Sequence, residues 1–124
     1  MGLTRSTVKF YDESDEPILC VYQQYDGYIS GVGHDLAKFL KGKKIVNGFG
    51  LGQTMENGFA NGIGCLAAQY VAEKKSEIGG FYLTTKDDEE EFNYEVRFID
   101  NKFIIKVEGF EGSPEELLEI REWE

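Results

Sequence analysis

Glycine is concentrated in the middle of this chain, and this placement constrains the possible folds more than any other feature of the sequence. Ten of the fifteen glycines lie between residues 27 and 64. Because glycine loses more backbone freedom on folding than other residues, a compact domain keeps so many together only where the backbone shape is needed. We therefore expect a glycine-rich loop region at residues 42–64, in which three Asn-Gly pairs mark tight turns with positive φ.

Apolar side chains alternate with period two on both sides of this region, which predicts β-strands. Residues 4–11 and 18–25 are joined by a polar turn that ends at Pro17, and most simply make a hairpin. The second of these strands begins almost continuously apolar, which is typical of a central strand covered on both faces. Asp100 and Asn101 predict a tight hairpin turn later in the chain. Three further strands are expected at residues 81–85, 92–98 and 103–107.

Helical spacing of apolar residues predicts three helices. A short one begins after Gly33 and ends at Gly42. A third is expected at residues 114–122, because Ser113 and Glu116 form a capping box around a proline at the first helical position. The second helix, which lies between these two in the chain, has the clearest pattern. Its apolar residues at helical spacing are Ile63, Leu66, Ala67, Tyr70 and Val71.

The order of these elements, ββααβββα, predicts a single α+β domain over residues 1–124. We expect two layers, with a mainly antiparallel sheet of about five strands and the helices packed on one face. A chain of 124 residues can bury a core without disulfides or metals, and Cys20 and Cys65 are interpreted as reduced, packed thiols. No run of eighteen apolar residues and no apolar leader is present, so we expect a cytoplasmic protein without membrane contact.

Acidic residues dominate the C-terminal part of the chain. Residues 1–76 hold eight acidic and eight basic side chains, whereas residues 77–124 hold fifteen acidic and five basic ones, which gives the net charge of −10. This charge repels nucleic-acid phosphates, so no direct nucleic-acid binding is expected. The favoured interpretation is a solvated hairpin tip at residues 86–91, and the alternative is an acidic surface that attracts a basic host protein.

The loop that joins the second strand to the first helix is the main candidate for a binding site, because loops often carry function. Asp26 can accept N–H bonds from the following turn while Gly27 supplies a positive φ. Tyr25 and Tyr28 flank this turn as aromatic surfaces on which a planar, nucleotide-like small molecule could stack. His34 completes the ligand-binding group that we predict in this loop.

Two asparagines, Asn57 and Asn61, extend this predicted ligand-binding set. They join it if the two glycine-rich passages, residues 27–33 and 47–64, meet in space and form one cleft over the end of the sheet. No metal site is expected, since one histidine and two distant cysteines give no pair at metal-ligand spacing. No cofactor is predicted.

Catalysis would need a different use of these residues. His34 could act as a base paired with Asp26 or Asp35. Cys65 lies near the start of the second predicted helix, where the helix dipole favours a thiolate. Cys65 also falls between apolar positions, so a core thiol is the favoured interpretation. We therefore assign no catalytic residue, and the sequence favours a non-enzymatic protein without deciding between the two classes.

Several segments resemble a widespread group of small uncharacterised proteins from phages, other viruses and bacteria. That group shares a pattern close to Tyr-Arg-x-Trp/Phe-Asp-Gly-Tyr-Pro-x-Gly, from which this chain departs at Gln24, Tyr25 and Ser30. The resemblance covers most of residues 4–108 and implies a viral or bacterial source, with the host cytoplasm as the location if viral, but no chemistry. The matching segments are Thr4-Arg5-Ser6, residues 22–28 with Gly31 and Gly33, residues 61–69, and residues 79–83.

Three functional hypotheses follow from these features. The favoured one is a small, acidic, non-enzymatic binding protein of viral type that sequesters a small molecule or blocks a host factor. The second is a small hydrolase or transferase that uses His34, Asp26 and Cys65. The third is a structural or assembly protein that forms a homo-oligomer through an exposed strand edge or helix.

Overall fold

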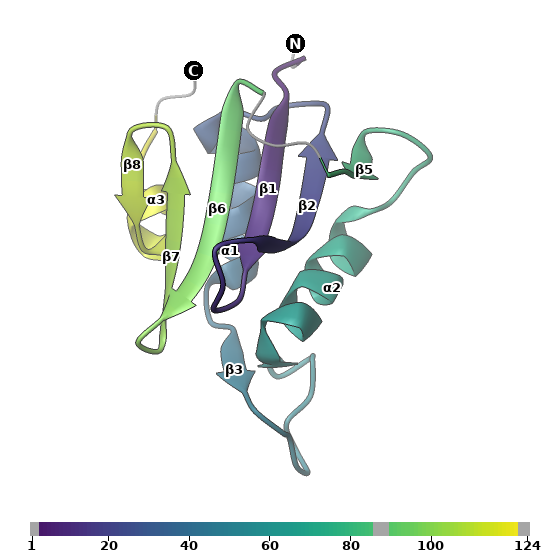
Figure 1. Cartoon of the computed structure of the whole chain (residues 1–124), viewed down its shortest axis with the longest axis vertical. Helices are drawn as coiled ribbons and strands as arrows, with labels where there is room; N and C mark the ends of the chain where they lie inside the picture. The colour runs from purple at the N-terminus through teal and green to yellow at the C-terminus, as the bar shows by residue number, and fades with distance from the viewer. Residues whose placement is uncertain (1–2, 86–89, 122–124) are drawn as a thin grey trace.

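Six strands form the main sheet of the computed structural model, which describes residues 3–85 and 90–121. They are β1 (Ser6–Tyr11), β2 (Pro17–Gln23), β5 (Phe81–Leu83), β6 (Phe92–Ile99), β7 (Lys102–Val107) and β8 (Phe110–Gly112). Their spatial order is β5-β2-β1-β6-β7-β8, and β1 and β6 are parallel while the other neighbours are antiparallel (Figure 1). The predicted α+β class with a mainly antiparallel sheet is confirmed, with six strands in place of about five.

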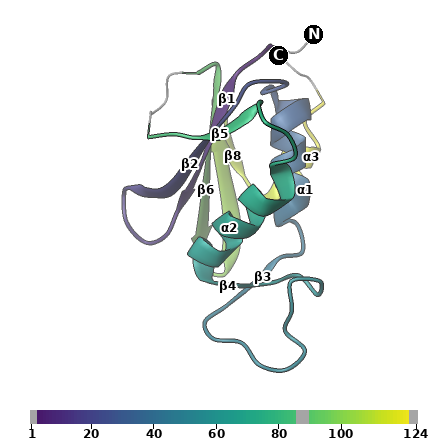
Figure 2. The same ribbon diagram turned by 90° about the vertical axis from the view of Figure 1, so that its right-hand side faces the viewer.

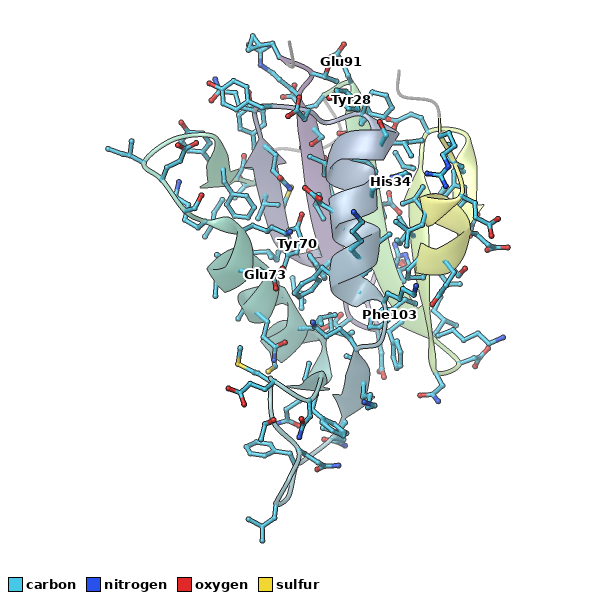
Figure 3. The ribbon with its side chains drawn as sticks, turned by 180° about the vertical axis from the view of Figure 1, so that it is seen from behind. Tyr28, His34, Tyr70, Glu73, Glu91 and Phe103 are labelled. Carbon is cyan, nitrogen blue, oxygen red and sulfur yellow. The ribbon has the colours of Figure 1, made fainter. Side chains whose placement is uncertain are left out.

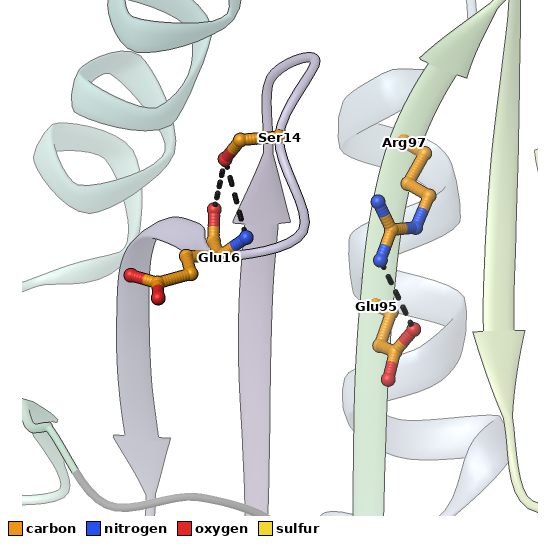
Figure 4. A network of polar contacts seen from close by, with 4 residues as sticks. All are labelled: Ser14, Glu16, Glu95 and Arg97. Carbon is orange, nitrogen blue, oxygen red and sulfur yellow. Dashed lines mark hydrogen bonds and ion pairs between the residues drawn. The ribbon is translucent and has the colours of Figure 1, made fainter.

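Two tight connections of the sheet follow the sequence signals. In the turn between β1 and β2, the hydroxyl of Ser14 accepts from the amide of Glu16 at 3.2 Å and donates to its carbonyl at 3.0 Å (Figure 4). Between β6 and β7, Asp100 and Asn101 have φ values of 52° and 66°, the left-handed conformation that a two-residue hairpin turn requires. Both predicted hairpins are confirmed.

The most deeply buried strand is β1. The second strand, β2, lies between β5 and β1, as predicted for a central strand, but the prediction that its apolar start is covered on both faces is wrong. All six residues of β1 are buried, whereas β2 begins with exposed Pro17 and Ile18. The reason is the non-local parallel pairing with β6, which places β1 inside the sheet between two long strands. On the face away from the helices, the Arg97 guanidinium lies 3.8 Å from the centre of the Tyr11 ring and covers it.

In the described residues, three α-helices and one π-helical turn cover one face of the sheet, as expected (Figure 2). The π-helical turn η1 (Ile29–Gly33) leads directly into α1 (His34–Leu40), and the others are α2 (Gly62–Lys74) and α3 (Pro114–Leu118). The predicted capping box is confirmed: the Ser113 hydroxyl accepts from the Glu116 amide, and the Glu116 carboxylate accepts from the Ser113 amide.

The last helix ends at Leu118, four residues before the predicted end at 122. Its final turn tightens, because the Ile120 amide donates to the Leu117 carbonyl three residues earlier. Position 122 itself lies outside the described residues, as does most of the predicted acidic tip at 86–91.

A second, two-stranded sheet was not predicted. It pairs β3 (Lys44–Val46) with β4 (Phe59–Asn61) in parallel, below the end of α1 in Figure 1. Each strand has only three residues, so neither shows a period-two pattern long enough to read. The chain between them, residues 47–58, extends away from the domain, and we call it the protrusion (Figures 1 and 2).

Two tyrosines lie in the core between the sheet and the helices. Tyr70 on α2 and Tyr94 on β6 are 1% and 0% exposed. Burial raises the pKa of both hydroxyls far above the ordinary tyrosine value, and the charge of Glu108 adds to the effect at Tyr94. Both side chains therefore stay neutral in the folded protein under conditions in which an unfolded tyrosine ionises.

We expect this difference to make the protein sensitive to alkali. Above a pH of about 10 the unfolded state loses tyrosine protons that the native state keeps, so the free energy of unfolding falls by ~1.4 kcal/mol per pH unit for each group. Below that pH neither tyrosine changes the dependence of the free energy of unfolding on pH. Urea unfolding measured from pH 8 to 11.5 tests this, with Tyr94→Phe as the comparison. An unchanged slope in that variant would contradict the assignment.

Candidate functional site

The predicted loop at residues 25–34 is shaped by contacts with the body of the domain. Asp26 itself has a φ of 56°, and its carbonyl accepts from the Val32 amide at 2.8 Å. Its carboxylate accepts from the Tyr28 hydroxyl at 3.1 Å. Gly27 does not have a positive φ, so that part of the prediction is wrong. Asp26 tolerates the left-handed conformation, as aspartate often does in turns.

The glycines of this loop are required by close packing. The Gly27 amide donates to the Thr4 carbonyl at 2.9 Å, and a Cβ at Gly27 would lie 2.8 Å from the Cβ of Ser6. The buried Tyr94 hydroxyl donates to the Gly27 carbonyl at 2.7 Å, and a Cβ at Gly33 would lie 3.1 Å from the same hydroxyl. The loop therefore lies directly against β1 and Tyr94, which explains its glycines without a ligand.

The side chains predicted to bind a ligand in this loop differ in their exposure to solvent. Tyr25 and Asp26 are exposed, while Tyr28 is half-buried. His34 Nε2 lies 2.7 Å from the carbonyl of Ile120, so this nitrogen carries the proton and donates. His34 thus ties the start of α1 to the segment after α3 (Figure 3).

The two predicted asparagines lie in and next to the protrusion. The Asn57 side chain donates to the Gly52 carbonyl at 2.8 Å, and the Asn61 side chain accepts from the Gly48 amide at 2.6 Å. The glycines of all three Asn-Gly pairs have positive φ, between 89° and 92°, as predicted. These asparagines hold the shape of the protrusion.

The predicted site residues therefore lie in two places. The loop before α1 lies at one end of that helix and the protrusion beyond the other, and both views of the fold agree on this (Figures 1 and 2). Residues 27–33 and 47–64 do not form one cleft. The hypothetical catalytic set is also divided, because His34 faces Ile120 whereas Cys65 lies beside Gln69 on α2, with 3.5 Å between its sulfur and the Gln69 amide nitrogen.

A pocket of about 290 Å³ lies between the protrusion and α2. Two of its apolar lining residues remain in solvent, since Phe49 is 67% exposed and Met55 is 64% exposed. Leu51, which belongs to the protrusion but does not line the pocket, is fully exposed. The lining of the pocket is mainly apolar, and we call it the apolar pocket; it consists of Val46, Phe49, Gln53, Thr54, Met55, Phe59, Asn61, Cys65 and Gln69. Sequence reasoning missed these apolar residues, although their interleaving with glycine in 48–52 was the available signal.

A groove of about 570 Å³ lies between the end of α1, the start of β7 and the start of α3. Three lysines line it, Lys41, Lys43 and Lys102, and we call it the lysine groove. Buried Leu40, Phe103 and Pro114 also line it. Glu115 and Glu116 line the same groove, and Glu116 is engaged in the capping box of α3.

The face of the sheet opposite the helices carries a third hollow, of about 630 Å³. Lys9, which is 2% exposed, lies among its lining residues together with Tyr11 and Cys20. Asp15 and Glu16 from the β1–β2 turn line it as well, so the hollow is lined by side chains of both charges. This mixture of charges selects no particular ligand.

No protein-family model, curated protein or solved structure matches this chain. None of the helices in the described residues has the length and apolar character needed to cross a membrane. Within residues 3–85 and 90–121, no three His, Cys, Asp or Glu side chains gather closely enough to hold a metal ion.

Proposed function

We propose that this chain is a non-enzymatic binding protein that contacts another protein through the protrusion and the apolar pocket. The observation that carries this proposal is the exposure of three large apolar side chains, Phe49, Leu51 and Met55, on one short segment. Exposed apolar side chains gathered in one patch mark interaction sites, whereas isolated ones are ordinary.

The local structure supports binding over accidental exposure. The protrusion is held by side-chain hydrogen bonds in its middle and at its base: the Gln53 carbonyl oxygen accepts from the Gly50 amide at 2.7 Å, and the Asn61 side chain accepts from the Gly48 amide. A segment fixed in this way loses little further freedom when a partner binds, which favours affinity. The pocket beside it offers a concave place for an apolar anchor of the partner.

The resemblance to small viral and bacterial proteins favours a host protein as the partner. Binding that blocks a host factor needs no reacting group, only a surface that competes with the factor's usual contacts. The predicted loop at residues 25–34 is not needed for this proposal, because its glycines and His34 have structural contacts of their own.

Selection of a random peptide display library on the intact chain tests the proposed surface. We expect enriched peptides to bind the Phe49→Ser and Met55→Ser variants at least about tenfold more weakly, since truncating an anchor in the centre of an interface removes a large share of the affinity. The measurement is fluorescence polarisation with labelled peptides.

The matched control is Ile78→Ser, which removes an apolar side chain that is 97% exposed on the segment between α2 and β5. It should leave peptide affinity unchanged. Peptides that bind Phe49→Ser as tightly as the original chain, or a selection that enriches no binder, would refute the proposed surface.

A further inference from the structure

The sequence around the protrusion is positively charged within an acidic chain. From residue 38 to residue 55 there are four lysines and no carboxylate, although the whole chain has a net charge of −10. The first carboxylate after Asp35 is Glu56. A local excess of one charge sets the electrostatic field close to that part of the surface, because exposed charges more than about 8 Å away are largely screened at physiological salt.

The structure places these lysines beside both hollows at this end of the molecule. Lys41 and Lys43 line the lysine groove, where Lys102 joins them from the start of β7. Lys44 lies at the apolar pocket: its Nζ is 5.1 Å from the centre of the Phe59 ring and donates to the Asn57 carbonyl at 3.2 Å. Residues 41–46 therefore contribute to the groove and to the pocket.

The carboxylates at this end leave the lysine groove with a net positive charge. Three lysines face Glu115 and Glu116, and the Glu116 carboxylate already accepts the Ser113 amide at 2.8 Å. Lys41 and Lys102 are exposed at the rim, whereas Lys43 packs over the Phe39 ring at 4.4 Å. The rim lysines are thus available for carboxylates of a partner.

We infer that the partner is an acidic peptide segment that seats an apolar side chain in the apolar pocket and directs carboxylates at Lys41 and Lys102. This inference rests on the proposed function and adds the charge of the partner to it. Charge complementarity of this kind steers encounter and excludes wrong partners more than it adds affinity. The acidic remainder of the chain would repel the same partner elsewhere, which fixes its orientation.

Other occupants fit these observations less well. A nucleic acid would meet the lysines, but it would offer the apolar pocket no aliphatic anchor. A membrane surface cannot fill a concave pocket of about 290 Å³ as a single side chain can.

The peptides enriched on the intact chain test the inference. We expect them to be acidic, with at least one aromatic or large aliphatic residue, and to bind Lys41→Gln/Lys102→Gln about fivefold more weakly, as loss of two exposed ion pairs implies. The affinity should also fall as salt is raised. Lys41→Arg/Lys102→Arg should keep it, and Lys74→Gln/Lys106→Gln, which removes two lysines elsewhere, should leave it unchanged.

The outcomes separate this inference from the proposed function. Neutral or basic peptides that require Phe49 but ignore the Lys41→Gln/Lys102→Gln change would overturn the inference and leave the proposed surface standing. Peptides that ignore Phe49→Ser would overturn both. Two results would replace the acidic peptide by another occupant: Phe49-dependent binding to phosphatidylserine–phosphatidylcholine vesicles, or a dimer in light scattering that Leu51→Ser abolishes.

Discussion

Gly31→Ala should destabilise the protein by ~3 kcal/mol or more and lower its melting temperature by ~10 °C, although Gly31 is neither fully buried nor in a left-handed conformation. A Cβ at this position would overlap the carbonyl oxygen of Asp26, which is backbone and cannot rotate away. That carbonyl also accepts the Val32 amide, so moving it would break the bond that closes the turn. Thermal unfolding followed by circular dichroism measures the effect.

Gly64→Ala provides the matched control and should act in the opposite direction. Gly64 lies in the first turn of α2, has no positive φ, and a Cβ there would meet nothing within 4 Å. Because alanine is the better helix former, this variant should be more stable by ~0.5 kcal/mol. Equal effects of the two substitutions would mean that the loop shape is not fixed by backbone packing.

The sequence predicted those structural features that depend on residues close together in the chain. The capping box at Ser113 and Glu116, the Asp100-Asn101 turn and the Asn-Gly turns each depend on residues within four positions of one another. Each was predicted with its mechanism, and each is present in the structure. The class of fold also followed, since long alternating and helical patterns report which face of an element is buried.

Contacts between residues that are far apart in the chain could not be predicted from the sequence. The parallel pairing of β1 with β6 joins Ser6 to Phe92, and no pattern in either strand specifies that partner. The Gly27 prediction had the same weakness: the turn chemistry pointed to a positive φ, whereas the actual constraint is the nearness of Ser6 and Tyr94. A single sequence shows that glycine is needed but not which atom excludes a side chain.

The candidate surface was missed for a related reason. Phe49, Leu51 and Met55 have no helical or strand period, so they could not be assigned to a face, and apolar residues without a period are ordinarily expected in the core. Only the structure shows that the protrusion leaves them in solvent. Of the lysines between residues 38 and 44, Lys38 lies in the last turn of α1, where a positive charge is favourable.

Tyr70→Ala should have the largest effect on stability, about 4 kcal/mol, because Tyr70 joins three elements of the core to α2. Its ring centre lies 5.3 Å from that of Phe10 on β1, 5.1 Å from that of Phe39 on α1 and 6.1 Å from that of Phe81 on β5. Such a loss is comparable to the whole stability of many domains of this size, so the variant should be partly unfolded at 37 °C.

Two further variants separate the ring from its hydroxyl and from aromatic content in general. Tyr70→Phe keeps the ring but removes the acceptor of the Gln23 amide, 2.9 Å away, and should cost about 1 kcal/mol. Tyr82→Ala removes a tyrosine that is 44% exposed and packs at a tilt against Tyr22 outside the core. It should cost less than half as much as Tyr70→Ala in urea unfolding. Equal losses of unfolding free energy in Tyr70→Ala and Tyr82→Ala would show that the contacts of the Tyr70 ring with its three phenylalanine neighbours do not organise the core.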